Sequence, residues 1–217
     1  MQHPIWDYSD LLEEAKERIE EKLIIEGEIK MTKVSNEIKI VIGSWGSYNE
    51  CNERALGSRW LDLADYSDWD EIVEELEKQG FELEGIDEEL FIQDIDNFPT
   101  SSANWDYMHP ETLFNLLHEA DVLDNTYKYD TLMAFLEVRG FEEFKSLVDT
   151  YGSSWDDDIN VYKNYDWEDY GREMFDCMGY KIEDWILDFF DFKAYGESFK
   201  YDGYIEEYSE GLIEIRR

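Results

Sequence analysis

The stretch from Gly152 to Asp176, GSSWDDDINVYKNYDWEDYGREMFD, interleaves carboxylates with aromatic rings along its whole length. It holds eight acids and only two bases. Carboxylates so close together can ligate a divalent cation, can carry out general acid–base chemistry, or can present negative charge to a basic partner. The spacing of the residues decides between these three kinds of site.

A metal site is not supported by that spacing. Asp156, Asp158 and Asn160 match the first three ligands of a calcium-binding EF-hand loop, but Val161 stands where that loop has glycine and Trp167 where it has the bidentate glutamate. No two of the three histidines stand at zinc-ligand spacing. The sequence therefore predicts no metal and no cofactor.

Catalytic motifs are also missing from the sequence. It has no GxSxG, Walker or GxGxxG pattern, and the glycine-rich segment 43–57 lacks the lysine of a P-loop and carries Glu50 and Glu53, which would repel phosphate. A Cys51 nucleophile would need a positioned histidine, to which the sequence gives no clue. Glycosidases use two carboxylates at a defined separation in space. Among 55 acids some pair will always have that separation, so a pair of acids in the sequence is no evidence for this activity. We predict that the chain is not an enzyme and keep an acidic enzyme or metal-binding domain as an alternative.

Negative charge dominates the composition. The 55 acids against 19 Lys and Arg give a formal net charge of -36, yet 43% hydrophobic and 16% aromatic residues indicate a folded chain rather than a disordered acidic tail. Twelve acids and no Lys or Arg lie between Lys78 and Lys128, so the charge runs through the folded part. Nucleic acid and anionic membranes would be repelled. The composition favours a basic protein partner, with a salt-adapted proteome or a passive acidic adaptor as alternatives.

The two cysteines, Cys51 and Cys177, do not form a disulfide framework, which is typical of a reducing cytoplasm. The N-terminus lacks the basic and apolar regions of a signal peptide. No apolar run approaches the roughly 20 residues that would span a membrane. We expect a cytoplasmic protein.

Hydrophobic periodicity predicts both helices and strands, grouped in successive modules. We expect an N-terminal helical extension (1–35), a small antiparallel sheet module (36–100), a central helical module (101–150) and an acidic C-terminal helix-plus-sheet module (151–217). The expected strands are 37–42, 58–63, 89–96 and the strand-like segment 192–217, with 43–57 and the start of the acidic stretch as loops. The expected helices are 9–23, 67–80, 110–122, 129–138, 141–150, 166–178 and 181–191.

The alternation of carboxylates and aromatic rings in residues 152–176 has a physical explanation if the protein imitates DNA. Duplex DNA carries one negative charge per ~1.7 Å of axis, so a charge of -36 corresponds to roughly 60 Å of duplex. A rigid scaffold would hold carboxylates in place without an ordering cost on binding. In the acidic stretch we expect that scaffold in the rings of Trp155, Tyr162, Tyr165, Trp167, Tyr170 and Phe175.

We expect carboxylates from all three folded modules to stand in for phosphates. The candidates in the first module and at its end are Asp65, Asp68, Asp70, Glu71, Glu74, Glu75, Asp94 and Asp96. Those in the rest of the chain are Asp121, Asp124, Asp156, Asp157, Asp158, Asp166, Glu168, Asp169, Asp176, Glu183, Asp184, Asp188 and Asp191.

Four collinear segments over residues 37–217 resemble the ArdA family of antirestriction proteins. The first is IVIGSWGSYNECNERALGSRWLDL (40–63), which has the family's Gly-x-Tyr-Asn loop and a Gly-x-Trp-type strand. LFIQDIDNFP (90–99) resembles its next strand, YDWEDYGREMFDCMGY (165–180) its acidic helix, and FDFKAYGESF (190–199) followed by GLIEI its C-terminal part. Two features depart from the family: Glu197 replaces an arginine, and residues 1–35 have no counterpart.

The resemblance implies an elongated, modular α+β fold and also a function. ArdA proteins mimic bent B-form DNA, usually as homodimers, are encoded by phages or mobile elements, and inhibit type I restriction–modification enzymes by occupying the DNA-binding groove. We therefore expect an anti-defence inhibitor that does not itself bind nucleic acid. A mimic directed at a CRISPR effector, another defence system or a nucleoid protein is the alternative within the same class.

Overall fold

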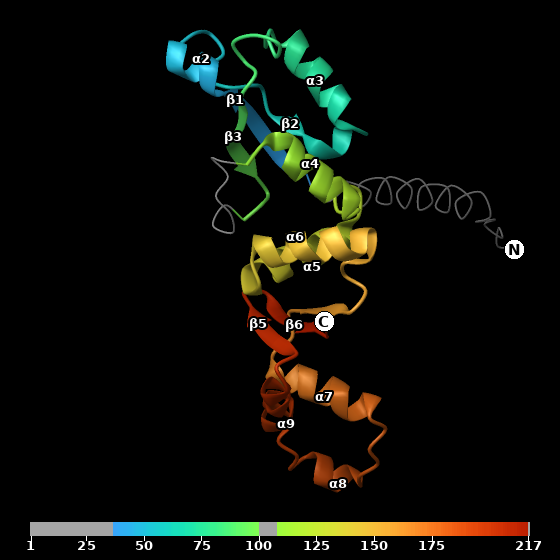
Figure 1. Cartoon of the computed structure of the whole chain (residues 1–217). Helices are drawn as coiled ribbons and strands as arrows, with labels where there is room; N and C mark the ends of the chain where they lie inside the picture. Colours follow the sequence, from blue (N-terminus) through green and yellow to red (C-terminus); the bar gives the residue numbers. More distant parts are fainter. Residues whose placement is uncertain (1–36, 100–107, 217) are drawn as a thin grey trace, which may run out of the picture. The chain divides into compact units, whose positions relative to one another are not determined.

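The computed structural model describes residues 37–99 and 108–216 (Figure 1). Residues Glu37–Arg217 form one compact unit. The helix expected at 9–23 lies outside the described residues. The described part is a mixed α+β fold with eight α-helices and two three-stranded antiparallel sheets, which confirms the predicted class. No helix in this part is both long and apolar enough to cross a bilayer.

The first sheet has the order β2-β1-β3. Its central strand β1 (Lys39–Ser44) pairs antiparallel with β3 (Leu90–Asp96) and, over two residues, with β2 (Leu61–Asp62). The expected strand at 58–63 is thus much shorter, because the side chain of Asp62 accepts a hydrogen bond from the Ala64 amide (3.2 Å) and begins a 3-10 turn, η1 (Leu63–Asp65). The buried Ile40 and Ile42 of β1 explain why this strand was recognisable.

The segment expected as a loop at 43–57 contains a short helix, α2 (Trp45–Glu50). Ser44 caps it, its hydroxyl accepting from the Ser47 amide at 3.3 Å, and Cys51 ends it in the left-handed conformation with φ 53°. Glycine, serine and asparagine are weak helix formers but good caps. Their abundance in this segment is typical of a loop, which is why the helix was not predicted.

Five of the expected helices are present with shifted ends, and the one expected at 166–178 is α7 (Trp167–Cys177). The other four precede the second sheet. They are α3 (Trp69–Lys78), α4 (Pro110–Glu119), α5 (Thr126–Val138) and α6 (Phe141–Tyr151). The start of α5 lies three residues before the expected one because Asn125 caps it, accepting from the Lys128 amide at 3.3 Å.

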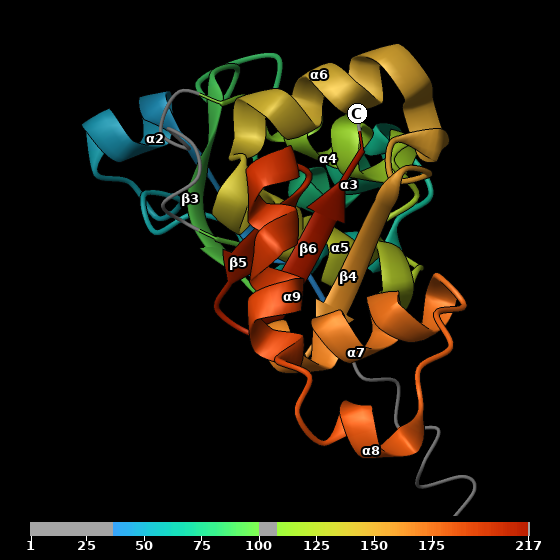
Figure 2. The ribbon, with the colours of Figure 1, turned by 90° about the horizontal axis from the view of Figure 1, so that it is seen from below.

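The second sheet has the order β4-β6-β5 and is formed by segments far apart in sequence. A short turn, η3 (Gly152–Ser154), leads into β4 (Ile159–Lys163), which pairs antiparallel with β6 (Gly211–Ile215); β6 also pairs with β5 (Ile205–Tyr208) (Figure 2). The strand β4 was not expected, since its hydrogen-bonding partner lies some fifty residues further along the chain.

Three helices lie between β4 and β5: α7 (Trp167–Cys177), α8 (Asp184–Leu187) and α9 (Phe192–Ser198). The helix expected at 181–191 is therefore only one turn long. The expectation of a strand from 192 onward was wrong for its first part, where α9 and a following turn, η4 (Phe199–Asp202), are helical. The side chain of Asp191 begins α9 by accepting from the Ala194 amide at 2.9 Å.

One buried cluster extends across the three modules expected from the sequence. It joins Ile42 of the first sheet to Phe114 and Phe144 of the central helices and to Trp155 and Ile213 near the second sheet. A smaller cluster, Trp167, Tyr170, Ile205 and Leu212, packs on the other side of that sheet. Neighbouring residues of a strand point to opposite faces, so β6 contributes to both clusters.

Candidate anionic interaction surface

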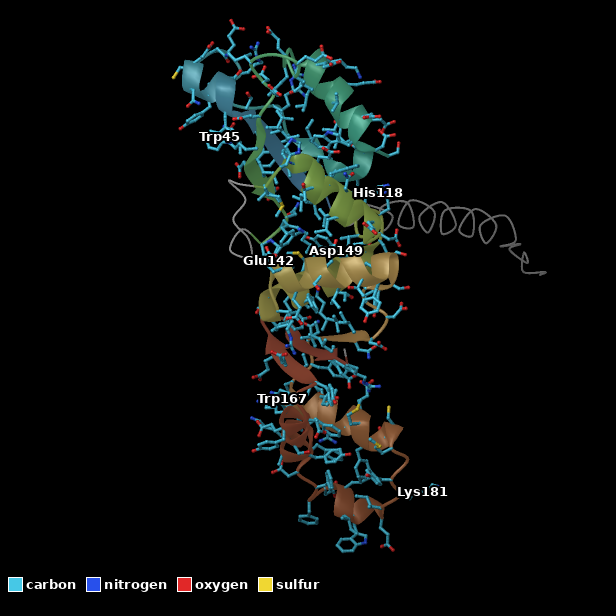
Figure 3. The ribbon with its side chains drawn as sticks, in the orientation of Figure 1. Trp45, His118, Glu142, Asp149, Trp167 and Lys181 are labelled. Atoms are coloured by element: carbon cyan, nitrogen blue, oxygen red, sulfur yellow. The ribbon has the colours of Figure 1, made fainter. Side chains whose placement is uncertain are left out.

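Nearly all of the candidate carboxylates are exposed. Glu75 is half-buried, Asp156 is buried, and the side chain of Asp184 lies outside the described part; every other candidate is exposed to solvent. Figure 3 shows oxygen-tipped side chains pointing outward along the helices. These carboxylates come from the first sheet module, from the connection between α4 and α5, from the turn before β4 and from the region of α7, α8 and α9. The surface is distributed rather than one compact patch.

Three of the candidates are the N-cap residues of helices. Asp68 accepts from the Glu71 amide at 3.0 Å at the start of α3, and Asp191 caps α9 in the same way. Asp166 accepts from the Glu168 and Asp169 amides at 2.8 and 3.0 Å, and Asp169 accepts from the Asp166 amide, which completes a capping box. A helix N-terminus favours negative charge, so these carboxylates are displayed in fixed positions.

The aromatic rings of the acidic stretch lie beneath this charge, as expected. Trp155, Trp167, Tyr170 and Phe175 are buried, and Tyr162 and Tyr165 are partly buried. Trp155 packs edge-to-face against Phe135 and Phe144 and donates its indole N–H to the Ala120 carbonyl (3.1 Å). Contacts of this kind hold the backbone that carries Asp157, Asp158, Glu168 and Asp169.

Asp156 is a correction to the candidate set, because its side chain is structural. It is 9% exposed and lies 3.6 Å from Nζ of Lys128. The same ammonium donates to the carbonyl oxygens of Ala120 and Ser153 and lies 3.5 Å from Asp121. Lys128 thereby joins the end of α4 to η3, and the Asp156 carboxylate neutralises it instead of facing a partner.

A second structural acid, Asp87, was not singled out from the sequence. It is completely buried and accepts hydrogen bonds from the Ser47 hydroxyl and from the Glu82 amide (2.9 Å), while Nε of Arg54 lies 2.8 Å away. Burial alone would raise the pKa of the Asp87 carboxyl, but the hydrogen bonds from Glu82, Ser47 and Ser44 and the Arg54 charge outweigh it and lower that pKa. This network fastens α2 to the segment before β3.

Replacing Asp87 by asparagine should therefore destabilise the fold by about 3 kcal/mol, because Arg54 loses a buried partner. The folded-state pKa of Asp87 is below its unfolded value, so its contribution is complete above about pH 4 and is lost as pH falls through the folded pKa. Urea unfolding of both proteins at several pH values would measure this. A stability difference that persisted unchanged well below pH 4 would contradict the assignment.

A third structural acid, Glu214, lies in β6. It is buried and accepts from Tyr162 Oη (3.4 Å), from Asn160 Nδ2 (3.3 Å) and from two nitrogens of Arg216. Burial and then the Glu214 charge raise the pKa of Tyr162, and the same two causes raise the pKa of Tyr170 to about 12. These tyrosines stay neutral at physiological pH, so carboxylates alone carry the negative charge.

No cluster of metal-ligating side chains is found in residues 37–99 and 108–216. No group of three or more His, Cys, Asp and Glu in this part could hold a metal ion. The ring nitrogen of His109 caps α4, and His118 packs on Phe114. The thiols of Cys51 and Cys177 are free and exposed, and Cys51 contacts the Tyr48 carbonyl.

The comparisons with known proteins agree with the segments singled out from the sequence. The family model described as "Antirestriction protein (ArdA)" matches residues 40–214. A search of curated proteins finds no match. The matched range includes most of the buried clusters and most of both sheets. It also includes Glu197, which is half-buried in α9 and makes no side-chain hydrogen bond or ion pair with another described residue.

Proposed function

The chain belongs to the ArdA family of antirestriction proteins, and from this premise we propose that it is a DNA mimic that inhibits type I restriction–modification enzymes. It binds in the groove that would otherwise hold DNA and is not itself an enzyme. It requires no cofactor, and its partner is the basic DNA-binding groove rather than nucleic acid. We place it in the cytoplasm of a bacterial host, encoded by a phage or mobile element.

The observation that carries this proposal is the display of exposed carboxylates on rigid, capped elements above buried rings. A net charge of -36 attracts any basic groove at long range. Fixed carboxylates then replace phosphates without a large loss of side-chain entropy on binding. No chemical step is needed, because occupancy of the groove excludes the substrate DNA.

We further propose that the protein is a homodimer. Around α8 the large side chains of Met178, Tyr180, Trp185 and Phe189 are all more than half exposed, which is unusual for a monomer of this size. A second copy of the chain would cover them and double the length of the charged surface. Sedimentation of the purified protein at micromolar concentration would detect a dimer, and a strictly monomeric species would overturn this proposal.

A displacement experiment tests the mechanism. Purified type I methyltransferase is bound to a fluorescent cognate duplex and then titrated with the protein at several salt concentrations. We expect complete displacement of the duplex, with an affinity that falls steeply as salt rises. Simultaneous binding of protein and duplex would contradict mimicry. If the methyltransferase is not bound at all, phage plating on hosts with other defence systems would show that the target is a different one.

A further inference from the structure

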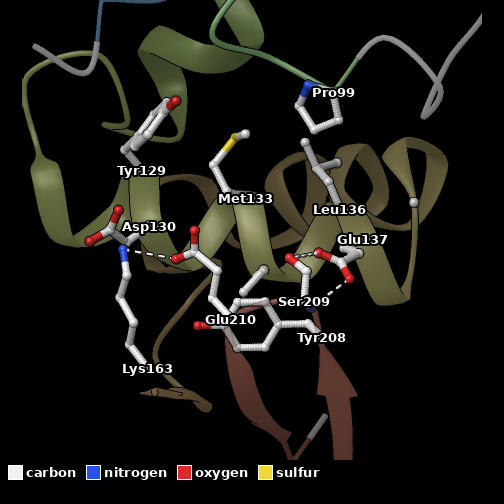
Figure 4. A pocket seen from close by; sticks show the side chains of 12 residues that line it. Pro99, Tyr129, Asp130, Met133, Leu136, Glu137, Lys163, Tyr208, Ser209 and Glu210 are labelled. Atoms are coloured by element: carbon white, nitrogen blue, oxygen red, sulfur yellow. Dashed lines mark hydrogen bonds and ion pairs between the residues drawn. The ribbon is translucent and has the colours of Figure 1, made fainter.

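A pocket of about 710 Å³ lies between α5 and the turn that joins β5 to β6 (Figure 4). Its size is in the range of ligand-binding pockets. Met133, Ala134 and Leu136 of α5 form an apolar wall together with Pro99, and Tyr208 lines the side formed by the turn. The pocket thus offers apolar surface and a ring in one hollow of an otherwise charged molecule.

Acids outnumber bases around this pocket. Its lining includes the carboxylates of Asp130, Glu137 and Glu210 and the ammonium of Lys163, whose Nζ lies 3.0 Å from Glu210. The two oxygens of Glu137 accept from the Ser209 amide (2.6 Å) and hydroxyl (2.8 Å). Asp130 is half-buried and makes no side-chain hydrogen bond or ion pair with any described residue. The hydrogen bond to Glu210 and then the charge of Asp130 raise the pKa of Lys163. The pocket therefore has a net negative charge, and the Asp130 carboxylate, close enough to act on Lys163, can still accept hydrogen bonds from a ligand.

The walls of the pocket are already fixed. The hydroxyl of Tyr129 donates to the Asn97 carbonyl at 2.9 Å, which joins α5 to the end of β3. The two hydrogen bonds of Glu137 attach α5 to the turn at Ser209. A ligand that enters this pocket need not order it first, which favours binding.

We propose that this pocket receives an arginine side chain of the target protein. The inference rests on the proposed function, because the target's DNA-binding groove is the source of the arginine. Apolar walls suit the methylene stem of arginine, tyrosine rings stack on its planar guanidinium, and carboxylates accept its N–H groups in pairs. Lysine fits less well because its compact ammonium neither stacks nor binds in a bidentate manner.

An arginine pocket would add specificity for one partner, which a charged surface alone does not provide. Attraction between exposed charges is weakened by salt and discriminates poorly between basic partners. Binding energy at protein interfaces is concentrated in a few desolvated contacts, with arginine among the most frequent. Asp130 and the α5 wall would therefore select one basic groove among many.

The test uses the full chain labelled with ¹³C at its methionine methyl groups, of which Met133 lines the pocket. The Met133→Leu variant identifies the Met133 signal. The probe is the peptide acetyl-Gly-Arg-Gly-amide, and its neutral counterpart carries citrulline instead of arginine. We expect the arginine peptide to shift the Met133 signal saturably, with a Kd of roughly 1 mM, and the citrulline peptide to leave it unchanged.

Two variants then test the role of the carboxylate. Asp130→Asn should weaken binding of the arginine peptide about tenfold, whereas Asp124→Asn, which removes an equal charge outside the pocket, should leave it within twofold. In the displacement experiment Asp130→Asn should likewise lose more affinity for the methyltransferase than Asp124→Asn.

Three results would overturn the proposed arginine site. They are no shift of the Met133 methyl signal, an equal shift with the citrulline peptide, or tighter binding of spermidine than of the arginine peptide. Displacement of the duplex that is equally affected by the two variants would also overturn it, yet would leave the mimic function standing. Conversely, a specific peptide response without any displacement of duplex would reject the mimic function and retain the pocket as an arginine site.

Discussion

Replacing five exposed acids of the acidic stretch together by their amides should weaken duplex displacement about 100-fold. The five are Asp157, Asp158, Asp166, Glu168 and Asp169. An exposed ion pair changes an affinity by only about two- to threefold, so the expected loss comes from the number of charges and not from any one of them. The remaining affinity should also depend less steeply on salt, because fewer charges are neutralised in the complex.

The design of this variant follows from the structure. Asp156 is left unchanged because its replacement would release Lys128 inside the fold. Asparagine at 166 can still cap α7, and amides keep the size of every side chain. The variant should therefore unfold at nearly the same urea concentration as the unmodified protein. The five single variants are the controls, and each should change the affinity by less than threefold.

Two results would contradict a distributed mimic. One is an unchanged affinity of the fivefold variant. The other is a single amide at one of these five positions that abolishes displacement while the urea transition stays where it was, since this would indicate a discrete site. The effect expected for Asp130 differs in kind, because that carboxylate lines a pocket and its contribution should persist in high salt.

The distributed charge could be predicted from the sequence, but the role of each acid could not. Asp156, Asp157 and Asp158 are consecutive and look equivalent, yet only Asp156 is buried against Lys128, which lies in α5. Asp87 likewise gives no local sign that Ser47 and Arg54 surround it. Whether a carboxylate is displayed or buried depends on contacts between distant segments, and no pattern in the neighbouring residues specifies them.

The dependence on contacts between distant segments also explains why some helices and strands were predicted wrongly. The isoleucines of β1 and the cap of α3 are local signals, and those elements were predicted close to their observed ends. In contrast, β4 depends on pairing with β6, and α9 contains an aromatic and glycine-containing sequence with low helix propensity. Tertiary packing against α7 makes α9 helical.

Two glycines make that packing possible. A Cβ atom at Gly196 would lie less than 3.0 Å from the Trp167 carbonyl oxygen, and one at Gly171 would lie equally close to the Phe192 carbonyl oxygen. The backbones of α7 and α9 therefore meet directly at these two points. The glycine of the AYG segment, which the sequence placed in a strand, has its role in a helix crossing.

Gly196→Ala should consequently destabilise the protein by about 3 kcal/mol, since the methyl group must force the two helices apart. The sign of this stability change distinguishes a close helix contact from an ordinary helix position, because alanine inside a helix is intrinsically more favourable than glycine by up to about 1 kcal/mol. Gly85→Ala is the matched control: its Cβ would meet nothing nearer than 3.5 Å, so its stability should change little. Urea unfolding of the three proteins would measure both effects.

The consequence for inhibition follows from the position of α7. This helix carries Asp166, Glu168 and Asp169, and its buried side contains Trp167 and Tyr170. If α9 is forced away, these carboxylates lose their fixed positions although the net charge is unchanged. Gly196→Ala should therefore reduce duplex displacement by at least tenfold at temperatures where the rest of the chain is still folded, whereas Gly85→Ala should not. Full displacement by a Gly196→Ala protein with a disrupted helix crossing would mean that charge alone is sufficient and that the rigid arrangement of the carboxylates is not required.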